Sequence, residues 1–113
     1  MTPALATLTR LPAAHAKGVH AGLTSVCSAH PLVIEAALLE AAATGAVACI
    51  EATCNQVNQD GGYTGMTPTD FRIFVLRIAE TLNFPAENIL FGGDHLGPNP
   101  WRKGGSANAM ANE

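Results

Sequence analysis

The sequence predicts an α/β fold in which parallel strands alternate with helices. Short apolar runs and longer helical patterns follow one another in the order strand, helix, strand, helix, strand. Each helical pattern begins with a proline next to a polar residue, as helix N-termini commonly do. This alternation is typical of parallel strands joined by right-handed helical crossovers. A parallel sheet buries both faces, which two helices cannot achieve, so we expect the N-terminal part of a larger α/β protein.

The first half of the chain contains the first two predicted strands and the helix between them. Residues 1–20 indicate a loose lead-in with at most a short helical turn, and residues 21–27 (AGLTSVC) a short strand. The Ala- and Leu-rich residues 32–44 predict a helix that ends at Gly45. This helix carries two charged side chains, so we expect other parts of the protein to cover most of it. Residues 46–52 (AVACIEA) predict a buried strand.

The second half adds a loop, a second helix and a third strand. Residues 53–66 are polar and glycine-rich and predict a long loop. Thr67, followed by a proline and then by Asp70 three residues on, is typical of a helix N-terminus. An apolar face at helical spacing follows, made of Phe71, Val75, Ile78 and Leu82. Residues 89–92 predict the third strand, and residues 107–113 (ANAMANE) the first turns of a further helix.

The composition favours a folded cytoplasmic protein without nucleic-acid or membrane partners. The formal net charge is −3 and the six Lys and Arg residues are spread along the chain, so the sequence has no basic stripe to bind a phosphodiester backbone. No apolar stretch reaches the roughly 20 residues that a membrane-spanning helix needs. The three cysteines are odd in number and lack a framework spacing, which indicates reduced thiols in the cytosol.

Polar side chains gather after each predicted strand, in residues 25–30, 51–63 and 94–99. Active sites of parallel α/β folds collect at the carboxyl ends of the strands. We therefore expect these three segments to converge on one rim of the molecule. A simpler explanation of the composition is that loops between strands and helices are polar in most proteins.

Asp94 and His95, in the motif GGDHLGPN, are the first candidates for chemistry. His95 offers a nitrogen to a divalent metal ion, and Asp94 a carboxylate for proton transfer. A catalytic metal site needs about three protein ligands, so further ligands would have to come from elsewhere. On spacing alone, a hydrogen-bonded loop pair, with Asp94 capping the chain and His95 packed, is the more common arrangement.

The loop and its neighbouring strands add candidates for substrate binding. Neutral amides that suit sugar hydroxyls or a phosphate are present at Asn55, Gln56, Asn58 and Gln59. An ordered loop of turn residues explains the same composition, and no Walker or dinucleotide-binding motif is present. Glu51 interrupts an apolar strand, where it either faces substrate or pairs with Arg or Lys, and Asn99 follows the third strand.

The cysteines are most simply explained as small buried side chains. Cys27 ends the first predicted strand, but the sequence shows no acid/base partner for it, so we do not expect it to act as a nucleophile.

Three long stretches together resemble one known family. SVCSAHPLVIEAAL, IEATCNQVNQDGGYTGMTPTDF and ILFGGDHLGPNPW are similar to the Z-type, so-called non-catalytic, subunit of class II D-tagatose-1,6-bisphosphate aldolase. The resemblance runs ungapped from about His20 to Trp101 and contributes little outside that range.

The resemblance implies a TIM (βα)8 barrel, with residues 1–20 as lead-in and residues 21–113 as its first three βα units, truncated. It implies an accessory subunit that supports the activity and stability of a zinc-dependent catalytic aldolase subunit in galactitol and N-acetylgalactosamine catabolism. That complex, a lyase, cleaves tagatose 1,6-bisphosphate reversibly to glycerone phosphate and glyceraldehyde 3-phosphate. A fragment of this length is expected to be inactive alone.

The resemblance also bears on the site residues. Catalytic aldolases of this class carry an Asp-His pair after a barrel strand, with the Asp as acid/base and the His as zinc ligand. By this likeness Asp94 and His95 form a metal-type site, which favours an alternative function as a metal-dependent ketose phosphate 4-epimerase or aldolase. In that alternative Glu51 and the amide-rich loop orient the sugar.

Overall fold

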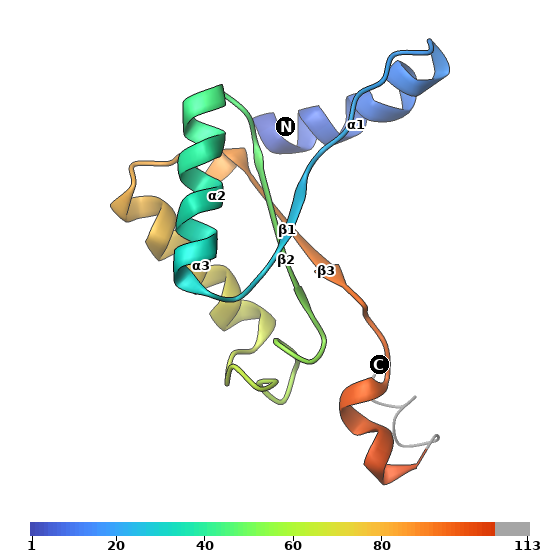
Figure 1. The fold of residues 1–113 in the computed structure, drawn as a ribbon, viewed down its shortest axis with the longest axis vertical. Helices are drawn as coiled ribbons and strands as arrows, with labels where there is room; N and C mark the ends of the chain where they lie inside the picture. The colour runs from blue at the N-terminus through green and yellow to red at the C-terminus, as the bar shows by residue number, and fades with distance from the viewer. Residues whose placement is uncertain (106–113) are drawn as a thin grey trace.

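Three parallel strands form a sheet in the order β1-β2-β3 in the computed structural model, which describes residues 1–105 (Figure 1). The strands are β1 (Ser25–Cys27), β2 (Ala48–Thr53) and β3 (Ile89–Asp94). The α-helices are α1 (Pro3–Ala16), α2 (Pro31–Thr44) and α3 (Pro68–Thr81), and two short 3₁₀ helices are η1 (Ala86–Asn88) and η2 (Asn99–Gly104). The predicted α/β class and the order of its elements are confirmed, and residues 107–113 lie outside the described part of the chain.

Strand β2 separates an apolar face of the sheet from a more polar one. Along β2, Ala48, Ile50 and Ala52 are buried, whereas the alternating residues between them are only partly buried. Successive side chains of a strand point to opposite faces, so each face receives every second residue. The buried series faces helices α2 and α3, and the other series faces away from them.

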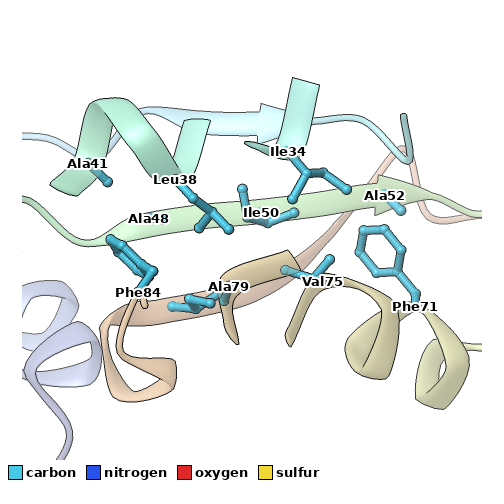
Figure 2. Close-up of a cluster of buried hydrophobic side chains, with 11 residues drawn as sticks. Ile34, Leu38, Ala41, Ala48, Ile50, Ala52, Phe71, Val75, Ala79 and Phe84 are labelled. Carbon is cyan, nitrogen blue, oxygen red and sulfur yellow. The ribbon is translucent and has the colours of Figure 1, made fainter. Parts of the chain in front are cut away.

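The hydrophobic core lies between β2 and the two helices (Figure 2). Helix α2 contributes Ile34, Leu38 and Ala41, and helix α3 contributes Phe71, Val75 and Ala79. The spacing of these residues by three or four positions keeps them on one side of each helix. Ile78 and Leu82, predicted to share the apolar face of α3, are partly buried against the same cluster.

The N-terminal segment differs from its prediction as a loose lead-in, because it contains the 14-residue helix α1. The Thr2 hydroxyl caps this helix by accepting a hydrogen bond from the Leu5 amide at 3.2 Å. Pro12 lies inside the helix, where it removes a backbone hydrogen-bond donor. Because proline disfavours a helix interior, the sequence did not predict a helix here. Contacts with η1 and with β3, together with the complete burial of Ala4, compensate for that loss.

The strand boundaries also shift from the predicted ones. Strand β1 is shorter than predicted, because only Ser25–Cys27 pair with β2. Strand β3 runs two residues further than predicted and includes Asp94, which pairs with Thr53. Asp94 is therefore held by the sheet itself and not by a loop.

Helix α2 is less covered than its composition predicts. Its outer surface exposes Leu32, Val33 and Leu39, with Leu32 67% accessible. Among the helices described in residues 1–105, none combines the length and apolar character that crossing a membrane requires.

The long loop between β2 and α3 is built around the buried side chain of Asn58. Its amide nitrogen donates to the Cys54 carbonyl at 2.8 Å, and its Oδ1 accepts from the backbone amides of Asp60 and Gly62 at 2.8 and 3.2 Å. Gly62 has a φ of +58°, and a Cβ at this position would collide with the backbone of Gln56. The loop is therefore an ordered structure whose path depends on a side-chain amide and a glycine.

The glycines of this loop provide a first test. We expect Gly62→Ala to lower the free energy of unfolding by more than about 2 kcal/mol, because it combines a left-handed backbone with a backbone collision. Gly65→Ala is the matched control, since Gly65 has a φ of +77° but nothing within 4 Å of the added methyl group. Its cost should be about 1 kcal/mol. Urea unfolding measures both, and equal losses would contradict the collision.

The capping box of α3 provides a second test. The Asp70 amide donates to the Thr67 hydroxyl at 3.3 Å, and the Thr67 amide donates to the Asp70 carboxylate at 3.0 Å. Thr67→Ala should lower the free energy of unfolding by about 1 kcal/mol. Thr69→Ala, which removes an exposed hydroxyl two residues further along the helix, should leave the free energy of unfolding nearly unchanged. Thermal unfolding of both variants checks this, and a larger loss in Thr69→Ala would refute the cap.

The same box has a pH signature. Hydrogen bonds from the Thr67 backbone, and then from its hydroxyl, lower the pKa of Asp70. A carboxyl whose pKa is lower in the folded state stabilises the fold above its unfolded pKa, and this stabilisation fades as the pH falls through the folded pKa. The difference in stability between the wild type and Asp70→Asn should therefore shrink in acid. A difference that grows in acid would contradict the assignment.

Candidate functional site

The polar segments that follow the three strands meet at one edge of the sheet. The loop after β2 and the helix η2 both lie beyond the carboxyl ends of the strands, whereas α1 lies at the opposite end (Figure 1). The Ser28 amide donates to the Glu51 carbonyl at 3.2 Å, and the Asn99 amide side chain donates to Asn55 Oδ1 at 3.0 Å. The expected convergence on one rim is thus what the structure shows.

Cys27, Glu51 and Asp94, which we call the Cys–Glu–Asp cluster, come from three adjacent strands. The register pairs Cys27 with Glu51 and Glu51 with Gly92, and Asp94 lies two residues beyond Gly92. Two residues is the repeat of a strand, so all three side chains lie on the face opposite the helices. Their thiol and carboxylate atoms lie within 4.8 Å of one another.

The Cys27 thiol is held in its protonated form by this environment. The loss of part of the water around the thiol raises the pKa of Cys27, although the residue as a whole is exposed. The negative charges of Asp94 and Glu51 raise this pKa further, and so does a hydrogen bond with Asp94. A thiol in such surroundings is a weak nucleophile in the metal-free chain. The Cys27 thiol also donates a hydrogen bond to Gln56 Oε1, at an Sγ–Oε1 distance of 3.9 Å.

The Glu51 carboxylate is not neutralised by a basic side chain. Within residues 1–105, no Arg or Lys forms an ion pair with it. Of the two explanations left open by the sequence, pairing with a cation is therefore not seen in the described chain. Gly92 leaves room beside the carboxylate, because a Cβ at that position would lie 3.6 Å from Glu51 Oε2.

Asp94 and His95 contact each other through the backbone and through their side chains. Asp94 Oδ1 accepts a hydrogen bond from the His95 amide at 2.8 Å, so the aspartate does cap the chain. His95 is not packed, since its side chain is 80% accessible and its Nε2 lies 3.7 Å from Asp94 Oδ2. His95 also has a φ of +46°, a left-handed conformation that turns the chain sharply after the strand.

A seam of contacts joins the loop after β2 to the segment after β3. The Cys54 thiol donates to the His95 carbonyl at 3.1 Å, and the Trp101 indole donates to the Asp60 carboxylate at 2.8 Å. The hydrogen bond between Asn99 and Asn55 lies between them along the chain. These contacts cross about forty residues of sequence and hold the two segments together at the rim.

The amide side chains predicted to bind substrate have different surroundings. Gln56 Oε1 accepts from the Thr53 amide at 2.8 Å and so ends β2, and Asn58 holds the loop as described above. Asn55 and Asn99 are exposed and bond to each other. Gln59 is an exposed residue of the same loop. Their role in binding a sugar stays a prediction.

Asn55, Asn58 and Asn99 also line an open hollow of about 720 Å³ between the loop and η2. The hollow is completed by Gly62 and by residues that sequence reasoning did not name as site candidates: Asp60, Tyr63, Pro100, Trp101, Arg102 and Lys103. Aromatic side chains, charged side chains of both signs and neutral amides line this hollow, a combination that suits a polar ligand.

Cys27 is the main residue that sequence reasoning missed. It was expected to be buried and without a partner, yet it is exposed and lies beside two carboxylates. The signal was its position at the end of a parallel strand, but aligning it with Glu51 requires the register of the sheet.

Comparison with known proteins assigns relatives to the chain. It is 62% identical over 96 residues to "D-tagatose-1,6-bisphosphate aldolase subunit GatZ" of Klebsiella pneumoniae, covering 85% of this chain and 23% of that protein. It is 58% identical over 105 residues to "D-tagatose 6-phosphate 4-epimerase" of Agrobacterium fabrum, covering 93% of this chain and 25% of that protein. The chain thus spans about a quarter of the length of the curated relatives it matches.

A solved structure is also similar. A protein of Sinorhizobium meliloti described as a probable tagatose 6 phosphate kinase superposes with a TM-score of 0.78 at 64% identity. The match covers 81% of this chain and 24% of that one. Finally, the model of one family, described as D-tagatose-1,6-bisphosphate aldolase subunit GatZ/KbaZ-like, matches residues 8–113. The resemblance read from the three sequence stretches is thereby confirmed, and the chain belongs to the GatZ/KbaZ-like family.

Proposed function

We propose that this chain acts as part of an accessory subunit of class II tagatose-1,6-bisphosphate aldolase, with the catalytic aldolase subunit as its partner. The match of the family model to residues 8–113 carries this proposal. In it, residues 21–113 are the first three βα units of a TIM (βα)8 barrel, preceded by α1. The proposed setting is cytoplasmic galactitol and N-acetylgalactosamine catabolism, with no nucleic-acid or membrane partner.

The arrangement of the strands supports the barrel proposal. Strands β1, β2 and β3 are parallel, lie side by side in chain order, and have helices α2 and α3 on one face. The opposite face carries the Cys–Glu–Asp cluster at the carboxyl ends of the strands. A (βα)8 barrel has its helices outside, and its active site at that end of the strands.

A second function, metal-dependent 4-epimerisation of a ketose phosphate, is favoured by the polar groups at the strand ends. A relative named as a tagatose 6-phosphate 4-epimerase is 58% identical over 105 residues. In this function Asp94 removes the proton of the C4 hydroxyl as the C3–C4 bond breaks, and returns it when the bond forms again on the other face of the aldehyde. Glu51, Asn55, Gln56, Asn58, Gln59 and Asn99 orient the sugar.

A divalent, zinc-like metal ion would supply polarisation of the ketose carbonyl in this chemistry. The family resemblance assigns its ligand to His95. The strand-end residues fit such an ion in two respects, namely the thiol and carboxylate donors of the cluster and the space that Gly92 leaves beside Glu51.

The two functions can be separated with two chimeras. The aligned segment of the Klebsiella subunit, and separately that of the Agrobacterium epimerase, is replaced by this chain. The first chimera is mixed with the catalytic aldolase subunit and assayed for cleavage of tagatose 1,6-bisphosphate. The second is assayed alone for conversion of tagatose 6-phosphate to its 4-epimer, fructose 6-phosphate.

If the accessory role is right, the first chimera raises aldolase activity and Asp94→Asn does not abolish that support. If Asp94 is the acid/base of an epimerase, Asp94→Asn lowers turnover of the second chimera at least about 100-fold. Glu87→Gln, which removes an exposed carboxylate at the other end of the sheet, is the control and should change neither activity. Failure of the first chimera to bind or activate the aldolase would refute the accessory role. Failure of Asp94→Asn to slow the second would refute the epimerase assignment.

A further inference from the structure

We propose that the Cys–Glu–Asp cluster is a metal site of the zinc type, in which Cys27, Glu51 and Asp94 are the three protein ligands. The proposal rests on the metal-dependent function above and assigns the metal ligands. It differs from the family resemblance in two roles, because Asp94 is a ligand here in place of the acid/base and His95 is not a ligand. Binding of the ion can be measured without any turnover, so the two proposals can fail separately.

The backbone places the three donors before any ion binds. Each ligand comes from a different strand, and the strand pairing fixes their positions relative to one another. In a tetrahedral zinc site, ligand atoms lie about 3.5 Å apart, given metal–ligand distances of about 2.0–2.3 Å. The donor atoms here lie within 4.8 Å of one another, so rotations of the Glu51 and Asp94 side chains suffice to close the site.

The negative charge of the cluster favours binding of a cation. Two carboxylates and a thiol lie together, and no Lys or Arg within residues 1–105 pairs with either carboxylate. In the described part of the chain, the one ion pair that these carboxylates form is with His95, whose Nε2 lies 3.7 Å from Asp94 Oδ2 and whose side chain is 80% accessible. In this setting a divalent ion relieves the repulsion between the two carboxylates.

The donor set selects the kind of ion. A thiolate favours zinc or cobalt over magnesium and calcium, which prefer oxygen donors. Three protein ligands leave a fourth position for water or a ketose oxygen, as in catalytic zinc sites. Cys27 is exposed and Gly92 has no side chain, so this position is open on the uncovered face of the sheet.

The location of His95 argues against it as a ligand of the same ion. Its ring is 80% accessible, and it is not among the residues whose donor atoms gather within 4.8 Å. His95 lies just beyond the last residue of β3, and of the three cluster residues only Asp94 forms an ion pair with it in the described chain.

The test is a titration of the metal-free 113-residue chain with Co²⁺, followed by competition with Zn²⁺. Co²⁺ bound by a thiolate gives a sulfur-to-metal charge-transfer absorption band. We expect one equivalent of Co²⁺ to produce this band, Zn²⁺ to remove it, and a large excess of Mg²⁺ to leave it unchanged. Cys27→Ser should abolish the band, and Glu51→Gln and Asp94→Asn should each weaken binding at least about tenfold.

Two variants are matched controls. Cys49→Ser removes a thiol from the same strand face, one strand repeat before Glu51, and should keep the band. His95→Asn removes the imidazole but tolerates the left-handed backbone, and should also keep it. Absence of Co²⁺ and Zn²⁺ binding would overturn the proposal. So would a band that survives Cys27→Ser, or one that is lost in His95→Asn.

A second measurement needs no variant and so does not depend on the folding of Cys27→Ser. Iodoacetamide labels accessible thiols, and mass spectrometry assigns the label to each cysteine. Zn²⁺ should protect Cys27 from labelling while the labelling of Cys49 and Cys54 stays unchanged. Equal labelling of Cys27 with and without Zn²⁺ would overturn the site.

Discussion

The pairing of β2 with a parallel strand on each side determines where every candidate functional group lies. Cys27, Glu51 and Gly92 form one row across the sheet, and Thr53 and Asp94 form the next. A shift of β2 by one residue against both neighbours would turn Glu51 toward the helices, where Ile50 now fills the core, and would separate it from Cys27 and Asp94. Burial of Ile50 between α2 and α3 therefore fixes the geometry of the polar face as well as that of the core (Figure 2).

The elements that the sequence predicts well are those with strong local signals. Thr67 and Asp70 mark the N-terminus of α3, and the spacing of its apolar residues identifies its buried face. Gly45 ends α2 with a φ of +67°. The position of the rim also followed from the strand–helix alternation, because carboxyl ends of parallel strands must share an edge. These inferences need only neighbouring residues or a general rule of topology.

The remaining features depend on contacts between distant segments. Helix α1 contains Pro12, so its own sequence disfavours a helix. Its contacts with β3 and η1, which are distant in sequence, stabilise it. Cys27 is a candidate metal ligand only because it lies beside Glu51, and that position depends on the pairing register of β1 with β2. Asn58 was selected for its side-chain amide, but composition could not show the three hydrogen bonds that this buried amide forms within the folded loop. In each case the deciding partner is remote in sequence.

The seam between the loop after β2 and the segment after β3 constrains how these proteins can be redesigned. Three hydrogen bonds join the segments, namely Cys54 to His95, Asn55 to Asn99 and Asp60 to Trp101. The conformation of each segment therefore depends on the other. Transplanting one of them alone from a relative would leave donors and acceptors on the other without counterparts. Exchange of specificity between members of the family would therefore require both segments to be grafted as a single cassette.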